Sequence, residues 1–93
     1  MEENFTTNIR ISPLNRDKLD DLENVKTYLK RRGKCEYSSV DTDPKEYRYK
    51  VGDSSIFIRE FTNRVNIDII SPTEPPLNRM RVNIGRVLEG KLI

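Results

Sequence analysis

This chain of 93 residues contains many carboxylates but lacks the side chain best suited to acid–base chemistry near neutral pH. Histidine, the commonest general acid or base near neutral pH and the commonest metal ligand, is absent. Carboxylates, lysines, tyrosines and one thiol remain, and each would catalyse only in a pocket that shifts its pKa. A domain of this length has little interior in which to build such a pocket. We therefore expect no enzyme activity and no cofactor.

Acidic residues gather at two places, and neither place has the spacing of a metal site. The first, at residues 17–23, begins a predicted helix, where carboxylates stabilise the positive end of the helix dipole. The second, at residues 41–43, lacks the glycine turn and downstream glutamate of a calcium loop. Cys35 is the only cysteine, which excludes an intrachain disulfide and a thiolate cluster. We expect no bound metal and a reducing compartment.

Basic residues offer two candidate binding sites, although the net charge is only +2 and any nucleic-acid contact must therefore be local. The first site lies at the end of the first predicted helix and comprises Lys30, Arg31, Arg32 and Lys34. Phosphate contact would use such a group, but stabilisation of the helix dipole alone also accounts for it and is the favoured explanation. Tyr37, Tyr47 and Tyr49 follow, either as stacking faces for bases or as ordinary sheet packing.

The second basic site lies on the last predicted helix. At 100° per residue, Arg79, Asn83 and Arg86 share the side opposite the apolar residues, so we expect them to point outward. Two guanidinium groups about 10 Å apart suit successive phosphates of RNA or carboxylates of a protein partner. The alternative is an ordinary solvated helix surface.

Six segments have the periodicity of regular secondary structure. Alternation of apolar and polar residues predicts strands, and apolar residues three and four apart predict helices. Residues 35–37 look extended and residues 41–45 resemble a loop. In chain order the segments are a strand at 5–11, a helix from Asn15 or Asp17 to Gly33 with Leu19, Leu22, Val25 and Leu29 as its apolar positions, strands at about 46–51, 55–61 and 64–70, and a helix that buries Leu77, Met80, Ile84, Val87 and Leu88.

This order predicts one α+β domain over residues 1–93, with the sequence β-α-β-β-β-α. We expect an antiparallel sheet of four or five strands with both helices packed on one face. The longest apolar run, Ile56 to Ile58, is too short for a membrane span or the core of a signal peptide. The predicted domain is therefore soluble and cytoplasmic, with no membrane contact.

The strand at 55–61 has apolar residues on both of its faces. Ile56 and Ile58 share one face, and Phe57 and Phe61 share the other. In a two-layer domain one face of the sheet stays open, so either the loop at 38–46 folds over it or a second chain covers it. We favour the second chain and predict a homodimer interface at Phe57 and Phe61.

The stretch from Ser55 to Lys91 resembles the small dimerising subunit of the KEOPS complex, which carries out the threonylcarbamoyl modification of tRNA adenosine in archaea and eukaryotes. Members of that family begin their last helix with Leu-Arg-x-x-x-Asn. Arg79 and Asn83 match this spacing, and Asn78 stands where the family often has leucine. The chain differs from the family at residues 35–51, which add material, and at its proline-rich segment 72–76.

The resemblance implies an accessory subunit without catalytic residues. Such a subunit forms a homodimer or pseudo-dimer, bridges two catalytic subunits and helps to contact tRNA. Our leading expectation is therefore a non-catalytic subunit of an RNA- or tRNA-acting complex that binds a protein partner or a second copy of itself.

Two other functions fit the same elements. The order helix, three strands, helix between residues 16 and 92 is similar to the double-stranded-RNA-binding domain. That domain usually begins its second helix with a lysine- and alanine-rich run, whereas this chain has Thr73 to Pro76 there and no alanine at all. The third possibility is an adaptor, for instance of viral origin, that binds only protein.

Overall fold

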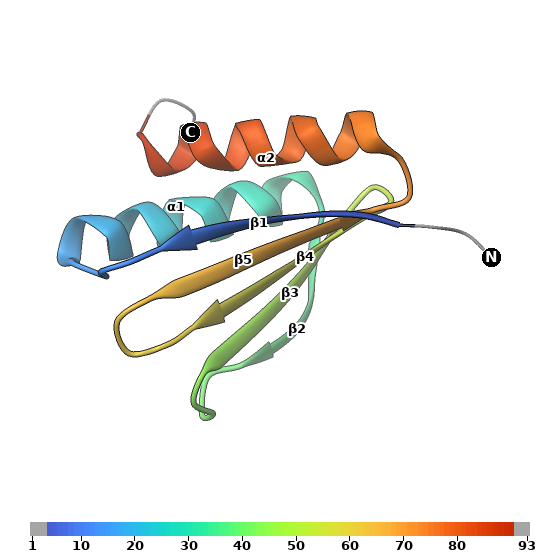
Figure 1. The fold of residues 1–93 in the computed structure, drawn as a ribbon. Helices are drawn as coiled ribbons and strands as arrows, with labels where there is room; N and C mark the ends of the chain where they lie inside the picture. Colours follow the sequence, from blue (N-terminus) through green and yellow to red (C-terminus); the bar gives the residue numbers. More distant parts are fainter. Residues whose placement is uncertain (1–3, 91–93) are drawn as a thin grey trace.

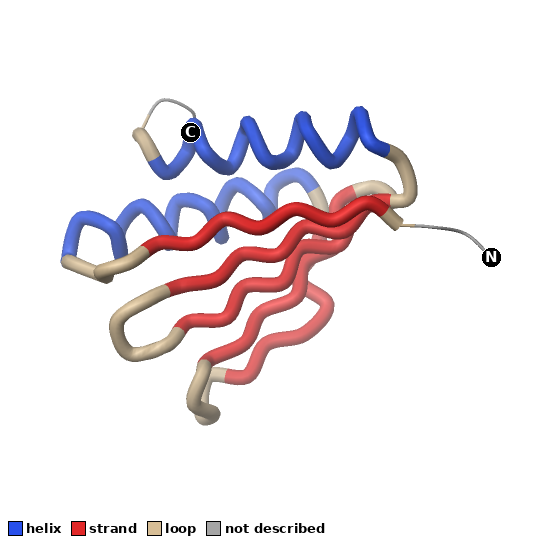
Figure 2. The backbone as a smooth tube through the Cα atoms, in the orientation of Figure 1, coloured by secondary structure: helices blue, strands red, loops and turns tan. Residues whose placement is uncertain are grey.

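The computed structural model describes residues 4–90, which form one antiparallel sheet with two helices on one of its faces (Figures 1 and 2). The α+β class and the two-layer arrangement predicted from the sequence are confirmed. In chain order the elements are β1 (Phe5–Ile11), α1 (Arg16–Arg32), β2 (Lys34–Ser39), β3 (Lys45–Val51), β4 (Ser54–Glu60), β5 (Val65–Ser71) and α2 (Glu74–Leu88).

The sheet has five strands in the spatial order β1-β5-β4-β3-β2. Strands β2 to β5 form a meander of hairpins, and α1 carries the chain from β1 at one edge to β2 at the other. The extended pattern at residues 35–37 is thus a fifth strand, and the observed order β-α-β-β-β-β-α is one strand longer than the order predicted. No residue of β2 is buried, so the strand depends on its backbone pairing with β3.

Helix α1 begins where the sequence predicts. The side-chain oxygen of Asn15 accepts a hydrogen bond from the Lys18 N–H at 2.9 Å, which caps the helix. Leu22, Val25 and Leu29 are buried in the core as their spacing predicts. Leu19 remains 40% exposed, because it lies in the first turns of α1 beside a hollow at the sheet end.

Gly33 ends α1 and brings the chain against the backbone of β3. Its N–H donates to the Leu29 carbonyl at 2.9 Å. A Cβ atom at Gly33 would lie only 1.9 Å from the Lys50 carbonyl oxygen, well inside any permitted contact. This position therefore requires glycine because of the close approach of the two backbones.

The core fills the space between the helices and one face of the sheet. Ile56 and Ile58 of β4 and Ile67 and Ile69 of β5 are fully buried there. Helix α2 contributes the five apolar residues that its periodicity predicts, and all of them are buried: Leu77, Met80, Ile84, Val87 and Leu88.

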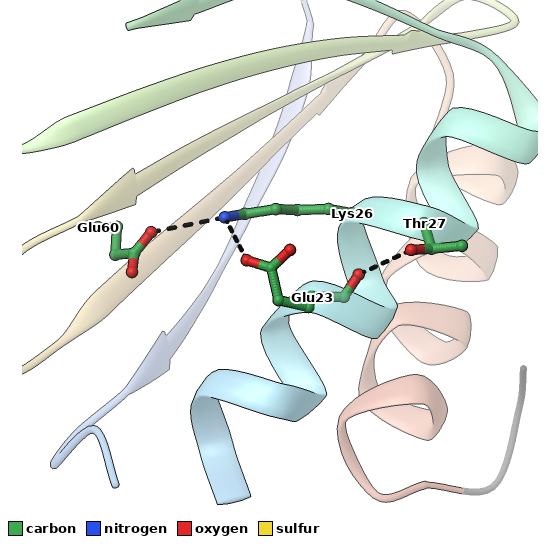
Figure 3. Close-up of polar contacts among 4 residues, drawn as sticks. All are labelled: Glu23, Lys26, Thr27 and Glu60. Atoms are coloured by element: carbon green, nitrogen blue, oxygen red, sulfur yellow. Dashed lines mark hydrogen bonds and ion pairs between the residues drawn. The ribbon is translucent and has the colours of Figure 1, made fainter. Parts of the chain in front are cut away.

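A buried lysine joins α1 to β4 (Figure 3). The Lys26 side chain is 11% exposed, and its Nζ donates to Glu23 Oε1 at 3.0 Å and lies 3.5 Å from Glu60 Oε2. The Tyr47 ring centre is 4.0 Å from the same nitrogen. Burial lowers the pKa of Lys26, but hydrogen bonds to Glu23 and Tyr47 and the nearby carboxylate charges outweigh it, so the pKa is raised. Lys26 therefore keeps its charge at neutral pH.

Tyr49 makes the stability of the domain sensitive to alkaline pH. Burial, followed by the neighbouring Cys35 on β2, raises the pKa of Tyr49 to about 12 from an ordinary value of 10.0. Between these two values the folded state retains a proton that the unfolded chain releases, so stability present at neutral pH is lost as the pH rises through this window. Lys26, whose pKa is also raised, acts in the same direction.

The free energy of unfolding of the wild type should fall between neutral and strongly alkaline pH. In Tyr49→Phe this fall should be smaller by about 2 kcal/mol. Urea unfolding at a series of pH values from neutral to strongly alkaline measures it. The wild-type curve should fall more steeply than the variant curve above pH 10. Parallel curves would contradict the raised pKa of Tyr49.

Candidate nucleic-acid interface

The end of α1, the β3–β4 turn and the start of α2 meet at one end of the molecule (Figure 1). The two helices run antiparallel, which brings the C-terminus of one beside the N-terminus of the other. A cavity of about 330 Å³ opens between them, and we call it the helix-end cavity. Its lining includes Tyr28 and Arg32 of α1, Gly52 and Asp53 of the turn, Thr73, and Arg79, Met80 and Asn83 of α2.

Tyr28 organises the side chains at the helix-end cavity. It is buried, and its hydroxyl oxygen accepts a hydrogen bond from Asn83 Nδ2 at 3.0 Å. The guanidinium of Arg32 lies 5.3 Å from the centre of the Tyr28 ring, a distance at which a cation is attracted to the aromatic face. Tyr28 thus ties α2 to α1 and holds Arg32 at the cavity.

The prediction that Asn83 points outward with Arg79 and Arg86 is wrong. Asn83 is half-buried and turned toward α1, because the buried Tyr28 hydroxyl takes it as a hydrogen-bond partner. Arg79 and Arg86 are exposed, and of these two Arg79 lines the cavity. The predicted stripe of three residues is therefore divided.

The two basic groups that the sequence places on separate helices converge at this end. Arg32 from the first group and Arg79 from the second line the same cavity, with Asp53 opposing their charge. The α2 dipole adds a partial positive charge, since α2 begins just after Thr73 in the lining. The remaining members of the first group are exposed close by in the chain, namely Lys30, Arg31 and Lys34.

The helix-free face of the sheet presents arginine, carboxylate and aromatic side chains. Alternation predicts that Phe57 lies there, and it does, half-buried and directly opposite Arg48 of β3. A shallow groove of about 190 Å³ includes Tyr37, Arg48, Phe57 and Arg59 in its lining. Both arginines face carboxylates, since Arg48 Nε lies 3.9 Å from Glu36 Oε1 and Arg59 Nε lies 3.6 Å from Glu46 Oε1.

Phe57 and Phe61 line different hollows on the surface. Phe61 follows the end of β4, where the Arg64 guanidinium lies 4.4 Å from its ring centre. Residues 38 and 39 belong to β2, so no long loop covers Phe57. The homodimer interface at Phe57 and Phe61 stays a prediction, and charged side chains surround Phe57 on this face.

Within residues 4–90, no group of three or more His, Cys, Asp or Glu side chains could hold a metal ion. In the same range, neither helix is long and apolar enough to cross a membrane. Cys35 is exposed, and its Sγ lies 3.4 Å from the Tyr37 carbonyl oxygen.

Comparison with known proteins finds no family model and no curated protein that matches the chain. The resemblance of Ser55 to Lys91 to the KEOPS subunit therefore stays a prediction. Of the two residues that carry it, Arg79 is exposed at the cavity and Asn83 is engaged by Tyr28.

Proposed function

We propose that this domain binds RNA without catalysing a reaction and serves as an accessory subunit of an RNA- or tRNA-acting complex. The observation that carries the proposal is the convergence of Arg32 and Arg79, from two helices, on the helix-end cavity. Each guanidinium presents paired donors that match phosphate oxygens, which is the commonest way proteins hold a nucleic-acid backbone.

The surroundings of the two arginines support phosphate binding. Contact with the Tyr28 ring restrains Arg32, so less side-chain entropy is lost when it takes a ligand. Arg79 lies one turn after Glu74, so the positive end of the α2 dipole and the Glu74 carboxylate both lie near it. The exposed residues Lys30, Arg31 and Lys34 would extend the contact along the backbone of the RNA.

The chemistry at the cavity favours binding over catalysis. Lys26 and Tyr49, the residues with raised pKa values, are not among the residues that line it. Both take part in packing α1 against the sheet. The cavity contributes instead two arginines, an amide already bonded to Tyr28 and apolar surface from Met80.

Replacing both arginines with glutamine should weaken binding to an unmodified tRNA transcript by about tenfold or more, because charge-assisted hydrogen bonds contribute roughly 1.5–3 kcal/mol each. The slope of log affinity against log salt concentration should fall by about one to two, since two phosphate contacts are lost. Fluorescence anisotropy at several salt concentrations measures both quantities for wild type and for Arg32→Gln/Arg79→Gln.

The matched control carries the same charge change at two arginines outside the cavity. Arg48→Gln/Arg59→Gln removes two positive charges from the helix-free face of the sheet, and we expect its affinity to stay within about twofold of wild type. Circular dichroism confirms that both variants fold. Equal losses in the two variants would show a general charge effect, and a loss confined to the control would move the site to the sheet.

A further inference from the structure

The two edge strands of the sheet differ in how they are protected from pairing. Each edge, β1 on one side and β2 on the other, has one row of backbone groups that faces away from its only neighbouring strand. Natural proteins protect such rows with charges, prolines or bulges, because a bare edge pairs with another strand. An edge strand that lacks these features is therefore the better candidate for pairing with a strand of another chain.

Strand β2 carries such devices. Its pairing with β3 is interrupted by a register shift between Cys35 and Tyr37, which bends the strand away from regular geometry. Lys34 and Glu36 add charges within its six residues. An incoming strand would therefore find β2 both irregular and charged.

Strand β1 has neither a bulge nor a proline within Phe5–Ile11. All seven of its residues pair with β5 in unbroken register, from Phe5 opposite Ser71 to Ile11 opposite Val65. It contains one charged residue, Arg10, and no proline or glycine. Phe5 is 43% exposed although it lies on the same side as the buried Ile11. This edge is long and regular, and no other strand of residues 4–90 pairs with it.

The sequence of β1 is complementary to itself. An antiparallel pair of β1 strands related by a two-fold axis at Asn8 would place Thr6 opposite Arg10, Thr7 opposite Ile9 and Phe5 opposite Ile11. No charge would meet a like charge, and the apolar and β-branched residues would form cross-strand pairs on the helix side. Centring the pair on another residue would leave part of β1 unpaired.

The helix layer allows the same arrangement. Helix α2 packs on β5 and β1, so it lies over the β1 edge. Neighbouring strands lie about 4.8 Å apart, so the two-fold axis would place the axes of the two α2 helices about 10 Å from each other. This is the distance between packed helices. Asn83 faces α1, so Gly85 lies on the opposite flank of α2, next to the 49%-exposed Val82. Arg81, exposed on that flank, can keep its guanidinium in water.

We propose that a second copy of this chain docks antiparallel on β1 and continues the sheet across the two-fold axis. This self-association goes beyond the proposed function and does not depend on RNA binding. It places the dimer contact at the β1 edge and the α2 flank, away from the helix-end cavity.

Opposite charges at Thr6 should move the dimer equilibrium in opposite directions. Thr6 lies opposite Ile70 within its own sheet but opposite Arg10 of the second copy in the proposed dimer, and symmetry makes this contact twice. Thr6→Lys should raise the dimer dissociation constant by about fivefold to tenfold, and Thr6→Glu should lower it by a similar factor. Analytical ultracentrifugation over a wide concentration range measures both.

Control variants at the other edge carry the same charges. Ser38→Lys and Ser38→Glu on the exposed β2 edge should leave the dissociation constant unchanged. A strict monomer, or equal constants for Thr6→Lys and Thr6→Glu, would overturn the proposal, and changes at Ser38 alone would move the interface to β2. Arg32→Gln/Arg79→Gln should dimerise like wild type, so a failure of the RNA-binding proposal remains distinguishable from a failure of this one.

Discussion

Gly33→Ala is expected to lower the free energy of unfolding by at least about 3 kcal/mol. A Cβ atom at this position would lie 1.9 Å from the Lys50 carbonyl oxygen and 2.9 Å from the Lys50 carbonyl carbon. Both are backbone atoms of β3, so no side-chain rotation relieves the clash, and α1 must separate from the sheet. The same corner places Arg32 at the helix-end cavity, so RNA affinity should fall with stability.

Gly52→Ala is the matched control for this variant. Gly52 lies in the nearby β3–β4 turn with a φ of 59°, and a Cβ there would meet no atom within 4 Å. Its replacement should cost only about 1–2 kcal/mol, the penalty of a left-handed backbone conformation for an L-residue. Urea unfolding measures both variants. A loss at Gly33 no larger than that at Gly52 would contradict the close approach of α1 to β3.

The second large effect is expected at Lys26. Lys26→Ala should cost about 2–4 kcal/mol, because Glu60, with a side chain only 16% exposed, loses its ion pair and the lysine stem leaves a gap between α1 and β4. Equilibrium unfolding at neutral pH measures this loss.

Two further variants separate charge from packing at this position. Lys26→Met keeps the apolar stem, so the stability it loses reports the charge interactions with Glu23, Glu60 and the Tyr47 ring. Adding Glu60→Leu to Lys26→Met should recover most of the loss, since an apolar pair replaces the ion pair without a buried lone charge. If Lys26→Met alone were as stable as wild type, the ion pair would contribute nothing net and the packing of the stem would account for the whole effect.

Helices and core could be predicted because their residues repeat with the period of the element that buries them. The five buried positions of α2 and the Asn15 cap of α1 are examples. Strand β2 could be predicted only as a short extended stretch, since its side chains are almost all exposed and leave no apolar alternation. Its formation depends on pairing with β3, which lies later in the chain.

The candidate site could be predicted in its parts but not in its assembly. Both basic groups are visible in the sequence, yet the meeting of Arg32 and Arg79 depends on the antiparallel packing of α1 and α2. A helical projection shows how far Asn83 lies from the apolar side, but it does not show which flank the other helix occupies. Tyr28 lies three residues after Val25 and four before Arg32, so it fits the apolar pattern of α1. This spacing was the feature of the sequence that could have indicated a buried tyrosine between the helices.

Phe57 illustrates the same limit on the sheet. Alternation correctly predicts that it lies on the helix-free face, because that depends on β4 alone. The side chains beside it come from neighbouring strands, and register places charged residues there, with Arg48 opposite on β3 and Asp68 opposite on β5. The face around Phe57 therefore carries charges of both signs, which the pattern of β4 alone does not show.

The central claim is that RNA binds at the helix-end cavity, and an NMR titration of the ¹⁵N-labelled domain with an unmodified tRNA transcript tests it most directly. The largest amide shift changes should occur at Arg32, Gly52 and Arg79, which line the cavity from three separate segments. They should weaken as salt is added. Changes confined to Tyr37 and Phe57 on the helix-free face, or no changes at all, would contradict the claim.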